Sequence, residues 1–499
     1  MNPQPTVSDT TEHEVEALVT QATQAAPLLA ATDRARRAVA LRAVADDLDL
    51  ARAELVQLAM EETHLPQARL EGEVGRTTGQ LRMFATGLEE EDGLVDVIID
   101  TADPQAAPVP RPDLRRMQVP VGPVVIFAAS NFPFAFSVAG GDTAAALAAG
   151  CPVVVKAHPG HPRTSARTGE IVQQALSRTG MPDGSFALVH GHDAGVTVLT
   201  HPAIRAGSFT GSIAGGRALF DIASSREVPI PFYAEMGSLN PTFVTPAAAA
   251  ARTEEIANGF IESFTMGVGQ FCTKPGLLFL PRGSALKKAI VSAAEGRPGG
   301  RMLMPRIFEG HQEVLGRISG RPGVEVLVDG SADADSGSAA PTVLSTDVQH
   351  LVSDADELLT ECFGPTTVLV EYDGLDDAVR AARVMEGNLT ATVHGEPSDS
   401  QDTAVTDLVG VLQDRAGRVL WNGWPTGVAV SWAQHHGGPY PATTVASHTS
   451  VGMTAVRRFQ RPVVFQDFPQ DALPVELRDA GPGGLVRRIN GRLTTEDVA

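Results

Sequence analysis

Cysteine is scarce in this chain of 499 residues, which contains only Cys151, Cys272 and Cys362. Three thiols are too few for a disulfide framework or a metal site built from several cysteines, so no metal is expected. Cys151 precedes an apolar strand and Cys362 stands beside a phenylalanine, which favours structural roles for both. Cys272 lies in the pentad Gly269–Thr273, after the amphipathic run Ile256–Val268. It is either a nucleophile or a small buried hydrophobe.

Positive charge and long apolar runs are also in short supply. The 39 basic residues are outnumbered by 59 acidic ones, which gives a net charge of −20. Such a surface repels phosphate groups, so we expect no nucleic acid and no membrane as a partner. The apolar stretch Val121–Ala139 is interrupted by Asn131 and Pro133 and does not resemble a membrane span. Residues 1–17 lack a secretory signal, and unpaired thiols suit a reducing compartment, so a cytoplasmic protein is expected.

Hydrophobic periodicity predicts an α/β protein with more than one domain. Residues 14–90 repeat apolar side chains every three or four positions, which indicates two or three packed helices. From Val121 to Glu235, β-branched runs alternate with alanine-rich stretches, a pattern typical of a parallel Rossmann-like sheet. A second α/β pattern extends from Leu239 to about Pro441. The expected strands are Val124–Ala128, Pro152–Lys156, Phe186–Val189, Ala206–Thr210 and Ile230–Ala234, then Leu277–Leu280, Val324–Val328, Val368–Tyr372 and Val419–Asn422.

Two further segments lie outside these patterns. Residues 98–118 are rich in proline and end in a strand-like run, Arg115–Val119, so we interpret them as an arm that leaves the domain. The residues after Pro469 include Gly481–Gly484 and are expected to be poorly ordered.

Lysine and a glycine-rich turn mark two strand ends. There are only four lysines against 35 arginines, and Lys156 closes a predicted strand. It has either a specific binding role or none beyond an exposed charge. The turn of Thr210, Gly211, Ser212 and Gly216 joins a strand to a helix, where backbone amides can meet a pyrophosphate. It lacks the GxGxxG pattern, so a plain tight turn is the alternative.

Two polar side chains follow other strands. Glu235 ends the apolar run Ile230–Ala234, and burial there predicts a raised pKa and a general base. The alternative is a glutamate in an ordinary salt bridge. Asn131 either donates to an oxyanion or caps the next helix.

Taken together, these motifs resemble those of the aldehyde dehydrogenase family over about Thr20 to Pro469. The resemblance implies that Cys272 is the nucleophile, Glu235 the general base and Asn131 the oxyanion donor. It also implies that Lys156 binds the cofactor ribose and that the turn at Thr210, Gly211, Ser212 and Gly216 binds the phosphates.

The resemblance extends to later motifs. Glu361–Pro365 matches the motif Glu-x-Phe-Gly-Pro, in which Glu361 holds the nicotinamide ribose and Phe363 contacts the ring. The resemblance further implies that Asn422 lies near the active site. Phe132, Phe136 and Phe271 are expected to line the tunnel for the aldehyde substrate.

The domain organisation that the resemblance implies has four parts. Residues 1–97 and 119–238 would bind the dinucleotide, and residues 239–442 would form the catalytic domain. Residues 98–118 and 455–470 would mediate assembly into a homodimer or homotetramer. Residues 471–499 would form a C-terminal tail.

Cofactor choice depends on one position near the ribose lysine. Many NAD-dependent members of the family carry an acid three residues after this lysine, and here that residue is Pro159. Without the acid a 2′-phosphate is tolerated, and His158 and Arg163 are the proposed partners for it. We therefore favour NADP, with NAD possible.

Several segments, including 127–133, 156–162 and 436–443, resemble the 2,5-dioxopentanoate dehydrogenases. That branch implies oxidation of this semialdehyde to 2-oxoglutarate, with fatty or other semialdehydes as the alternative. A CoA-acylating dehydrogenase is disfavoured by Glu235, and a silent structural homologue by the intact Asn131, Glu235 and Cys272. No arginine can be assigned from the sequence to the distal carboxylate.

Overall fold

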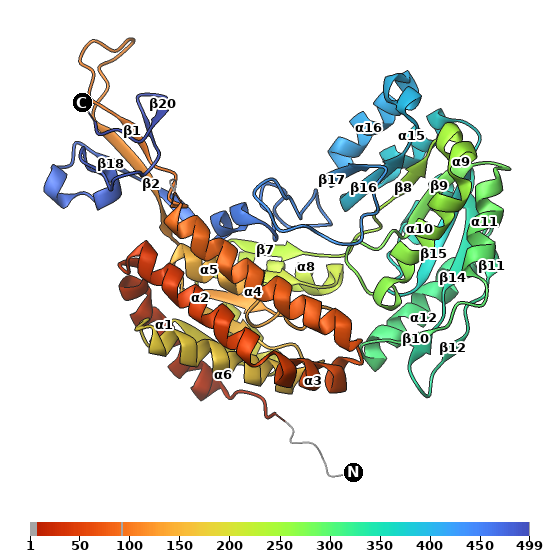
Figure 1. Ribbon diagram of the computed structural model, residues 1–499, viewed down its shortest axis with the longest axis horizontal. Helices are drawn as coiled ribbons and strands as arrows, with labels where there is room; N and C mark the ends of the chain where they lie inside the picture. The colour runs from red at the N-terminus through yellow and green to blue at the C-terminus, as the bar shows by residue number, and fades with distance from the viewer. Residues whose placement is uncertain (1–6, 91–92, 499) are drawn as a thin grey trace.

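The computed structural model describes residues 7–90 and 93–498, which form two α/β lobes and a projecting arm (Figure 1). Residues 1–6, 91–92 and 499 belong to the predicted cofactor-binding segment and tail, and they lie outside the described residues. The predicted α/β fold is confirmed. In the described part of the chain, no helix combines the length and the apolar character needed to cross a membrane.

The first lobe is built on a parallel five-stranded sheet with the order β5-β4-β3-β6-β7. All five of its strands were predicted to within two residues, because each is a short apolar run between turns. The strands are β3 (Val124–Phe127), β4 (Val153–Lys156), β5 (Phe186–Val189), β6 (Ala206–Thr210) and β7 (Phe232–Glu235). The helices that connect them are α5 (Gly141–Ala149), α6 (Pro162–Arg178), α7 (His192–Thr200) and α8 (Ile213–Ser224). The order reverses beside β3, and ligands of such sheets bind outside the carboxyl ends of strands at this point.

Four helices precede this sheet, rather than the predicted two or three. They are α1 (Glu12–Ala30), α2 (Arg34–Leu50), α3 (Arg52–Thr63) and α4 (Gln67–Glu89). Short breaks separate them: Asp33 caps α2 through the N–H of Ala35, and Pro66 precedes α4. Breaks of one to three residues leave the apolar periodicity almost continuous, which is why the count was wrong.

The second lobe contains a seven-stranded sheet with the order β11-β14-β15-β9-β8-β16-β17, in which only β11 is antiparallel. The predicted strands correspond to β9 (Leu277–Pro281), β11 (Glu325–Val328), β15 (Thr366–Tyr372) and β17 (Ala416–Trp421). Three strands were not predicted: β8 (Thr242–Val244), β14 (Thr342–Asp347) and β16 (Asn388–His394). They are short or rich in buried threonine, so they lack a continuous apolar run.

Helices cover this sheet on both sides, and a small three-stranded sheet lies beside it. The helices are α9 (Pro246–Ala251), α10 (Thr253–Thr265), α11 (Ala285–Ala294), α12 (Pro305–Ser319), α13 (Val348–Ser353), α14 (Ala355–Leu358), α15 (Leu375–Val384) and α16 (Thr403–Arg415). The small sheet consists of β10 (Gly300–Arg301), β12 (Ala332–Asp333) and β13 (Ser338–Ala339).

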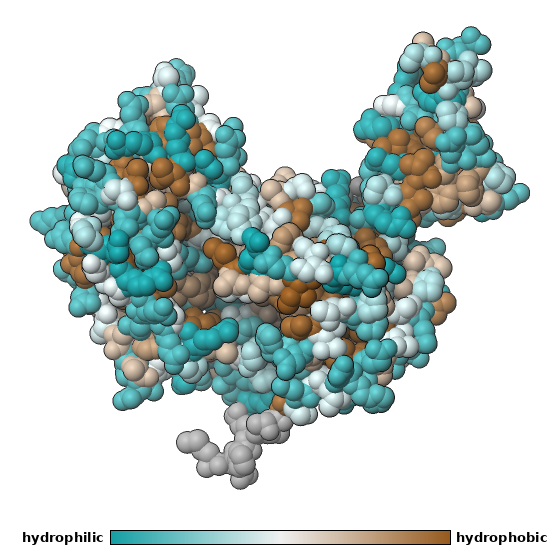
Figure 2. Space-filling model, turned by 180° about the vertical axis from the view of Figure 1, so that it is seen from behind, coloured by the Kyte–Doolittle hydropathy of each residue, from teal (hydrophilic) through white to brown (hydrophobic). Residues whose placement is uncertain are grey.

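The arm is a separate five-stranded sheet, ordered β18-β2-β1-β19-β20. Its strands are β1 (Ile98–Asp100), β2 (Leu114–Pro120), β18 (Gln460–Gln466), β19 (Arg487–Ile489) and β20 (Arg492–Thr494). The expectation of a poorly ordered tail was therefore wrong, because residues 487–494 add two strands to this sheet. Figure 2 shows the molecular surface hollowed between the arm and the second lobe.

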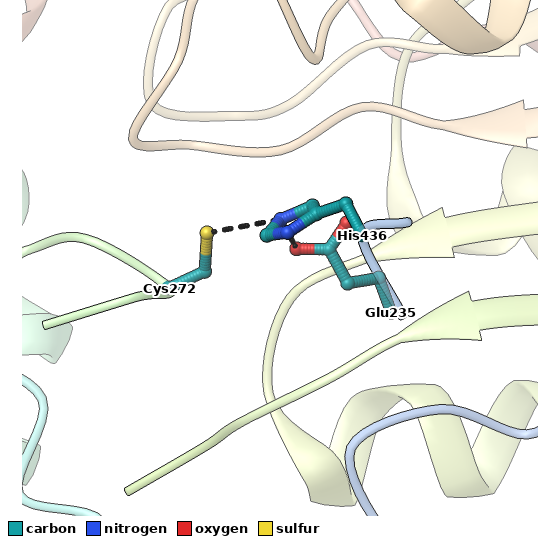
Figure 3. A group of neighbouring side chains, drawn as sticks. All are labelled: Glu235, Cys272 and His436. Atoms are coloured by element: carbon teal, nitrogen blue, oxygen red, sulfur yellow. Dashed lines mark hydrogen bonds and ion pairs between the residues drawn. The ribbon is translucent and has the colours of Figure 1, made fainter. Parts of the chain in front are cut away.

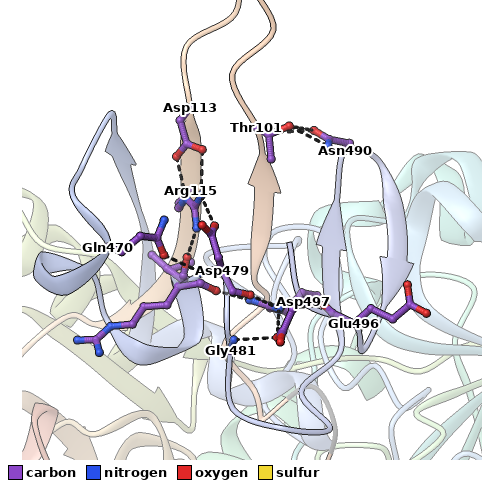
Figure 4. Close-up of polar contacts among 12 residues, drawn as sticks. Thr101, Asp113, Arg115, Gln470, Asp479, Gly481, Asn490, Glu496 and Asp497 are labelled. Carbon is purple, nitrogen blue, oxygen red and sulfur yellow. Dashed lines mark hydrogen bonds and ion pairs between the residues drawn. The ribbon is translucent and has the colours of Figure 1, made fainter. Parts of the chain in front are cut away.

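A buried arginine ties the tail to the arm (Figure 4). Arg115 on β2 donates to Asp113 at 2.7 Å, to Asp479 at 2.7 Å and to the carbonyl of Leu477 at 2.6 Å. The tail also contributes Leu473, Leu477 and Leu485 to a small apolar core under the sheet. Burying these leucines is the physical reason that the tail is ordered.

Candidate active site

The Cys272 loop begins where α10 ends, at Thr265, three residues before the predicted end of the amphipathic run. Gly267, Val268 and Gly269 then adopt left-handed φ angles of 57°, 58° and 66°. Such a conformation is strained for a β-branched residue such as Val268, and strain of this kind concentrates at functional sites. A Cβ on Gly269 would collide with the carbonyl of Gly364, so the glycine lets the Cys272 loop approach the loop that carries Glu361.

Two side chains that were not predicted hold this loop. Asn240 donates from Nδ2 to the carbonyls of Cys272 at 2.8 Å and Lys274 at 3.0 Å. Lys274 is buried and donates from Nζ to the carbonyls of Cys362 at 2.7 Å and Thr366 at 2.8 Å. The scarcity of lysine that drew attention to Lys156 applied equally to Lys274.

Cys272, Glu235 and His436 meet at the centre of the site (Figure 3). Nε2 of His436 lies 2.9 Å from Oε1 of Glu235 and 3.5 Å from Sγ of Cys272. Ser450 donates a hydrogen bond to the other carboxylate oxygen of Glu235. The three donor atoms are close enough to share a metal ion, but these separations are those of hydrogen-bonded groups. From the sequence, His436 was noted only within the segment 436–443, and its place beside Cys272 and Glu235 was not predicted.

The chain returns to β7 to bring His436 into place. The N–H of Met236 donates to the carbonyl of Ala442 at 2.8 Å, which fastens the returning segment beside the end of the strand. Within that segment Ser450 donates from its N–H to the carbonyl of His436 at 2.9 Å. Both partners of Glu235 therefore come from one segment more than 200 residues later in the chain.

The pKa of Glu235 is lowered, so the predicted increase was wrong. Burial by itself raises this pKa, but His436 and the hydrogen bonds to its carboxylate outweigh burial. Burial and the neighbouring Glu235 instead raise the pKa of the Cys272 thiol well above its usual value. In the resting site the carboxylate is ionised and the thiol protonated, so His436 and Glu235 are placed to accept the thiol proton.

Asn131 lies directly beside the Cys272 loop. Its Nδ2 donates to the carbonyl of Gln270 at 3.0 Å, and its own carbonyl accepts from Arg69 at 2.6 Å. One amide proton of Asn131 is used to orient the side chain, and the second is available for an oxyanion. Its role as the oxyanion donor stays a prediction.

The three predicted tunnel phenylalanines form one aromatic cluster. The Phe132 ring lies 5.2 Å from the rings of both Phe136 and Phe271. Phe136 in turn lies 6.2 Å from the His436 ring. Phe132, Phe136 and Phe271 therefore form an apolar wall beside the reactive groups, as expected of a substrate tunnel.

The predicted phosphate turn is closely packed at the start of α8. Ser212 caps the helix by accepting from the N–H of Gly215 at 3.2 Å. A Cβ on Gly211 would lie 2.5 Å from the Phe209 ring, and one on Gly216 would lie 2.6 Å from Sδ of Met236. Thr210 ends β6 just before the turn. A helix N-terminus that begins with a glycine-rich turn fits a dinucleotide phosphate.

Lys156 and Glu361, the predicted ribose-binding residues, come from different lobes. Lys156 ends β4 and packs against Gly195, whose Cβ would lie 2.8 Å from the lysine Cγ. Glu361 lies against Gly237, just after β7, so closely that a Cβ there would collide with its carboxylate. Burial raises the pKa of Glu361 to about 7. Phe363 is half-buried in the same loop. Residues from both lobes thus fit a nicotinamide cofactor.

Three predicted residues are placed elsewhere or lack the expected charge. The Arg163 guanidinium pairs with Glu61 at 3.0 Å and Glu62 at 3.3 Å, so its charge is already balanced. Burial holds the pKa of His158 well below its usual value, so this ring is neutral near pH 7. Asn422 is exposed and uses its amide to bind Arg252 and the backbone of Gly395.

The other two thiols are structural, as predicted. Cys151 is fully buried, and its Sγ donates to the carbonyl of Phe459 at 3.2 Å. Burial raises its pKa to about 11. Cys362 packs in the core of the second lobe, and burial raises its pKa as well.

The model of the aldehyde dehydrogenase family matches residues 2–439. The chain therefore belongs to the aldehyde dehydrogenase family, whose members are oxidoreductases that use NAD(P). It is 45% identical over 463 residues to alpha-ketoglutaric semialdehyde dehydrogenase 2 of Azospirillum brasilense, a match that covers 92% of this chain and 87% of that protein. It is 41% identical over 490 residues to alpha-ketoglutaric semialdehyde dehydrogenase of Acinetobacter baylyi, with 98% and 93% covered.

Solved structures of the same fold agree with the architecture. 3,6-Anhydro-L-galactose dehydrogenase in complex with NAP is similar with a TM-score of 0.76 and 21% identity, over 92% of each chain. Aldehyde dehydrogenase 21 of Physcomitrella patens, in complex with the reaction product succinate, is similar with a TM-score of 0.78 and 20% identity. That match covers 93% of this chain and 92% of the other.

Proposed function

We propose that this aldehyde dehydrogenase oxidises 2,5-dioxopentanoate to 2-oxoglutarate, with NADP as its preferred cofactor. The contact between Cys272, His436 and Glu235 carries the proposal for a hydrolytic dehydrogenase. The relatives named as alpha-ketoglutaric semialdehyde dehydrogenases support this substrate, since the likeness extends over nearly the whole chain.

The first step transfers the thiol proton and forms a carbon–sulfur bond. His436, which already contacts Cys272 and Glu235, accepts the proton, and the thiolate attacks the aldehyde carbon. The carbonyl oxygen becomes an oxyanion that is stabilised by Nδ2 of Asn131 and the N–H of Cys272. Ion pairing with Glu235 compensates for the positive charge on the imidazole.

The second stage releases the acid. A bound nicotinamide ring would supply the acceptor for the hydride of the adduct. Glu361 and Phe363 would orient that ring beside Cys272. The thioester that remains on Cys272 is hydrolysed by water, from which Glu235 removes a proton. The carboxylic acid leaves, and the sulfur is restored for the next turnover.

Lys156, Arg306 and Pro159 support the preference for NADP. Arg306 on α12 is exposed, acts electrostatically on both Lys156 and His158, and has no ion-pair partner among the described residues. Pro159 leaves no acid to repel a 2′-phosphate.

Measuring kcat/KM with NADP and NAD tests the preference. Arg306→Ala is expected to lower kcat/KM for NADP by about tenfold and to leave NAD unchanged, and a wild-type preference for NAD would contradict this choice.

Product analysis tests the reaction itself. With 2,5-dioxopentanoate, the purified protein is expected to form one 2-oxoglutarate per NADPH, at the same rate with and without CoA. Formation of a CoA thioester would contradict the hydrolytic mechanism. A higher kcat/KM for long-chain aldehydes than for 2,5-dioxopentanoate would contradict the proposal that 2,5-dioxopentanoate is the substrate.

The arm supports assembly into a homodimer or homotetramer. Strand β18 is at the edge of its sheet and exposes Val464, with Phe468 just beyond it, at 53% and 47% of their surfaces. An unpaired edge strand with exposed apolar residues suits a subunit contact. Light scattering is expected to give a dimer or tetramer, and a monomer would contradict the assignment.

A further inference from the structure

Helix α4 presents an ordered polar face to the aromatic wall of the active site. Its residues Arg69, Glu73 and Arg76 are spaced by four and three positions and therefore share one side of the helix. Arg69 stacks 4.5 Å from the centre of the Phe271 ring, and Arg76 lies 5.5 Å from the centre of Phe136. Each arginine is thus placed over a phenylalanine of the predicted tunnel.

The two arginines differ in their hydrogen bonds. Arg69 donates to the carbonyl of Asn131 at 2.6 Å, so it has a structural partner. Arg76 has buried Nε and Nη2 atoms with no hydrogen-bond partner among the described residues. Leaving the donors of a buried guanidinium unsatisfied is costly, and the cost is relieved when an anion binds.

Glu73 does not fill this role. Its Oε1 accepts from the backbone N–H groups of Phe134 and Ala135, at 2.8 and 3.0 Å. It acts electrostatically on Arg76 but forms no ion pair with it within 4.0 Å. Its position therefore stabilises the loop that carries Asn131, while Nε and Nη2 of Arg76 have no acceptor among the described residues.

Arg76 is also close to the reacting groups. Charges at Cys272, Glu73 and Glu235 are near enough to act on the Arg76 guanidinium. Phe136 neighbours both groups, because its ring centre lies 5.5 Å from the Arg76 guanidinium and 6.2 Å from the His436 imidazole. A short aldehyde bound at Cys272 along this wall would direct its far end toward Arg76.

We propose that Arg76 binds the carboxylate at the end of the substrate opposite the aldehyde and so selects short aldehydes that carry an acid group. The planar guanidinium suits a carboxylate because two parallel N–H groups can meet its two oxygens. The inference rests on the proposed function, since a semialdehyde with a distal acid needs such a partner.

Paired substrates test the role of Arg76. In Arg76→Met, which keeps the length of the side chain, kcat/KM for 2,5-dioxopentanoate is expected to fall about 10- to 100-fold, mostly through KM. Pentanal, which has the same length and no acid, is expected to lose much less, because only the electrostatic effect of Arg76 on the Cys272 thiol is removed. Arg76→Lys is expected to lose less, because it keeps the charge but not the planar pair of donors.

Arg82→Met is the matched control. Arg82 is on the same helix and pairs at the surface with Asp46 and Asp49, so its loss is expected to change neither substrate. Glutarate, a dicarboxylate without an aldehyde, is expected to inhibit the wild-type enzyme competitively and to inhibit Arg76→Met at least about tenfold more weakly.

The outcomes separate this inference from the proposed substrate. An equal loss for 2,5-dioxopentanoate and pentanal in Arg76→Met would overturn the inference, because it would indicate an effect on the thiol or the fold. No loss for either substrate would also overturn it. If the wild-type enzyme instead prefers succinic semialdehyde, the proposed substrate fails, and the same comparison with succinic semialdehyde and butanal tests Arg76.

Discussion

The two sides of Cys272 satisfy their polar groups in different ways. On the β7 side, each carboxylate oxygen of Glu235 has a protein neighbour, the His436 imidazole at 2.9 Å and the Ser450 hydroxyl. On the α4 side, the half-buried Arg76 lies over an aromatic ring, and its buried Nε and Nη2 atoms have no acceptor among the described residues. The residues proposed to transfer protons thus already contact one another in the folded protein. The residue proposed to recognise substrate instead has donors that a substrate carboxylate would satisfy.

The largest effect is expected on the β7 side, from Cys272→Ala. Removing the nucleophile is expected to lower kcat by at least about 1,000-fold for every aldehyde, charged or neutral. The measurement is NADPH formation with 2,5-dioxopentanoate and pentanal. Cys151→Ala, which removes a buried structural thiol, is expected to keep activity within about twofold. Substantial aldehyde oxidation by the Cys272 variant would contradict the assigned nucleophile.

Glu235→Gln is expected to uncouple the two stages of the reaction. Loss of the base is expected to slow deacylation by about 100- to 10,000-fold, so a thioester accumulates on Cys272 and is visible in the mass of the intact protein. The carboxylate also raises the pKa of the Cys272 thiol, so its removal lowers that pKa. Alkylation of Cys272 by iodoacetamide at pH 7 is therefore expected to be faster in the variant. Slower or unchanged alkylation would show that Glu235 does not raise the pKa of the Cys272 thiol.

His436 is expected to influence the acidic limb of the pH profile. It lowers the pKa of Glu235, so His436→Phe is expected to raise that pKa and to move the acidic limb of kcat toward higher pH. His436→Gln, which keeps a neutral donor, is expected to move it less. An acidic limb at the wild-type pH in both variants would show that Glu235 does not depend on this imidazole.

The smallest effect is expected on the α4 side, from Glu73→Gln. Burial raises the pKa of Glu73, so the folded protein loses stability as pH rises from the ordinary carboxyl range through that raised value. Glutamine keeps an acceptor for Phe134 and Ala135 but does not ionise. Relative to wild type, the variant is expected to gain stability with rising pH, by about 1 kcal/mol. Thermal unfolding at pH 4 and pH 8 measures this difference, and a constant difference would exclude the ionisation of Glu73 as its source.

The strands of the first lobe were predictable because each is a short apolar run with clear turns at both ends. The same rule failed for β16, whose buried residues include Thr390 and Thr392. In the sequence, threonines at these positions indicate an exposed strand or loop. In the folded protein, the neighbouring strands bury them. The prediction of a poorly ordered tail was wrong for the same reason. The leucines of the tail are buried only against apolar residues of the arm, which are distant in the sequence.

The candidate site divides along similar lines. Cys272, Glu235 and Asn131 stand in recognisable local motifs, and the structure brings them together around the Cys272 loop. His436 and Asn240 were missed because their roles depend on contacts with residues far away in the chain. The pKa of Glu235 was misjudged for the same reason, since burial can be inferred locally but the opposing His436 cannot.

The sequence by itself determined the kind of chemistry and the class of fold. Nucleophile, base and oxyanion donor are single residues in short motifs, and apolar periodicity is a local property of the chain. Only the tertiary structure decided which way the pKa values shift and whether Arg69 or Arg76 keeps donors without an acceptor among the described residues. Coulomb energies and hydrogen bonds depend on distances across the fold, and Arg76 differs from Arg69 only in what lies within reach of its guanidinium.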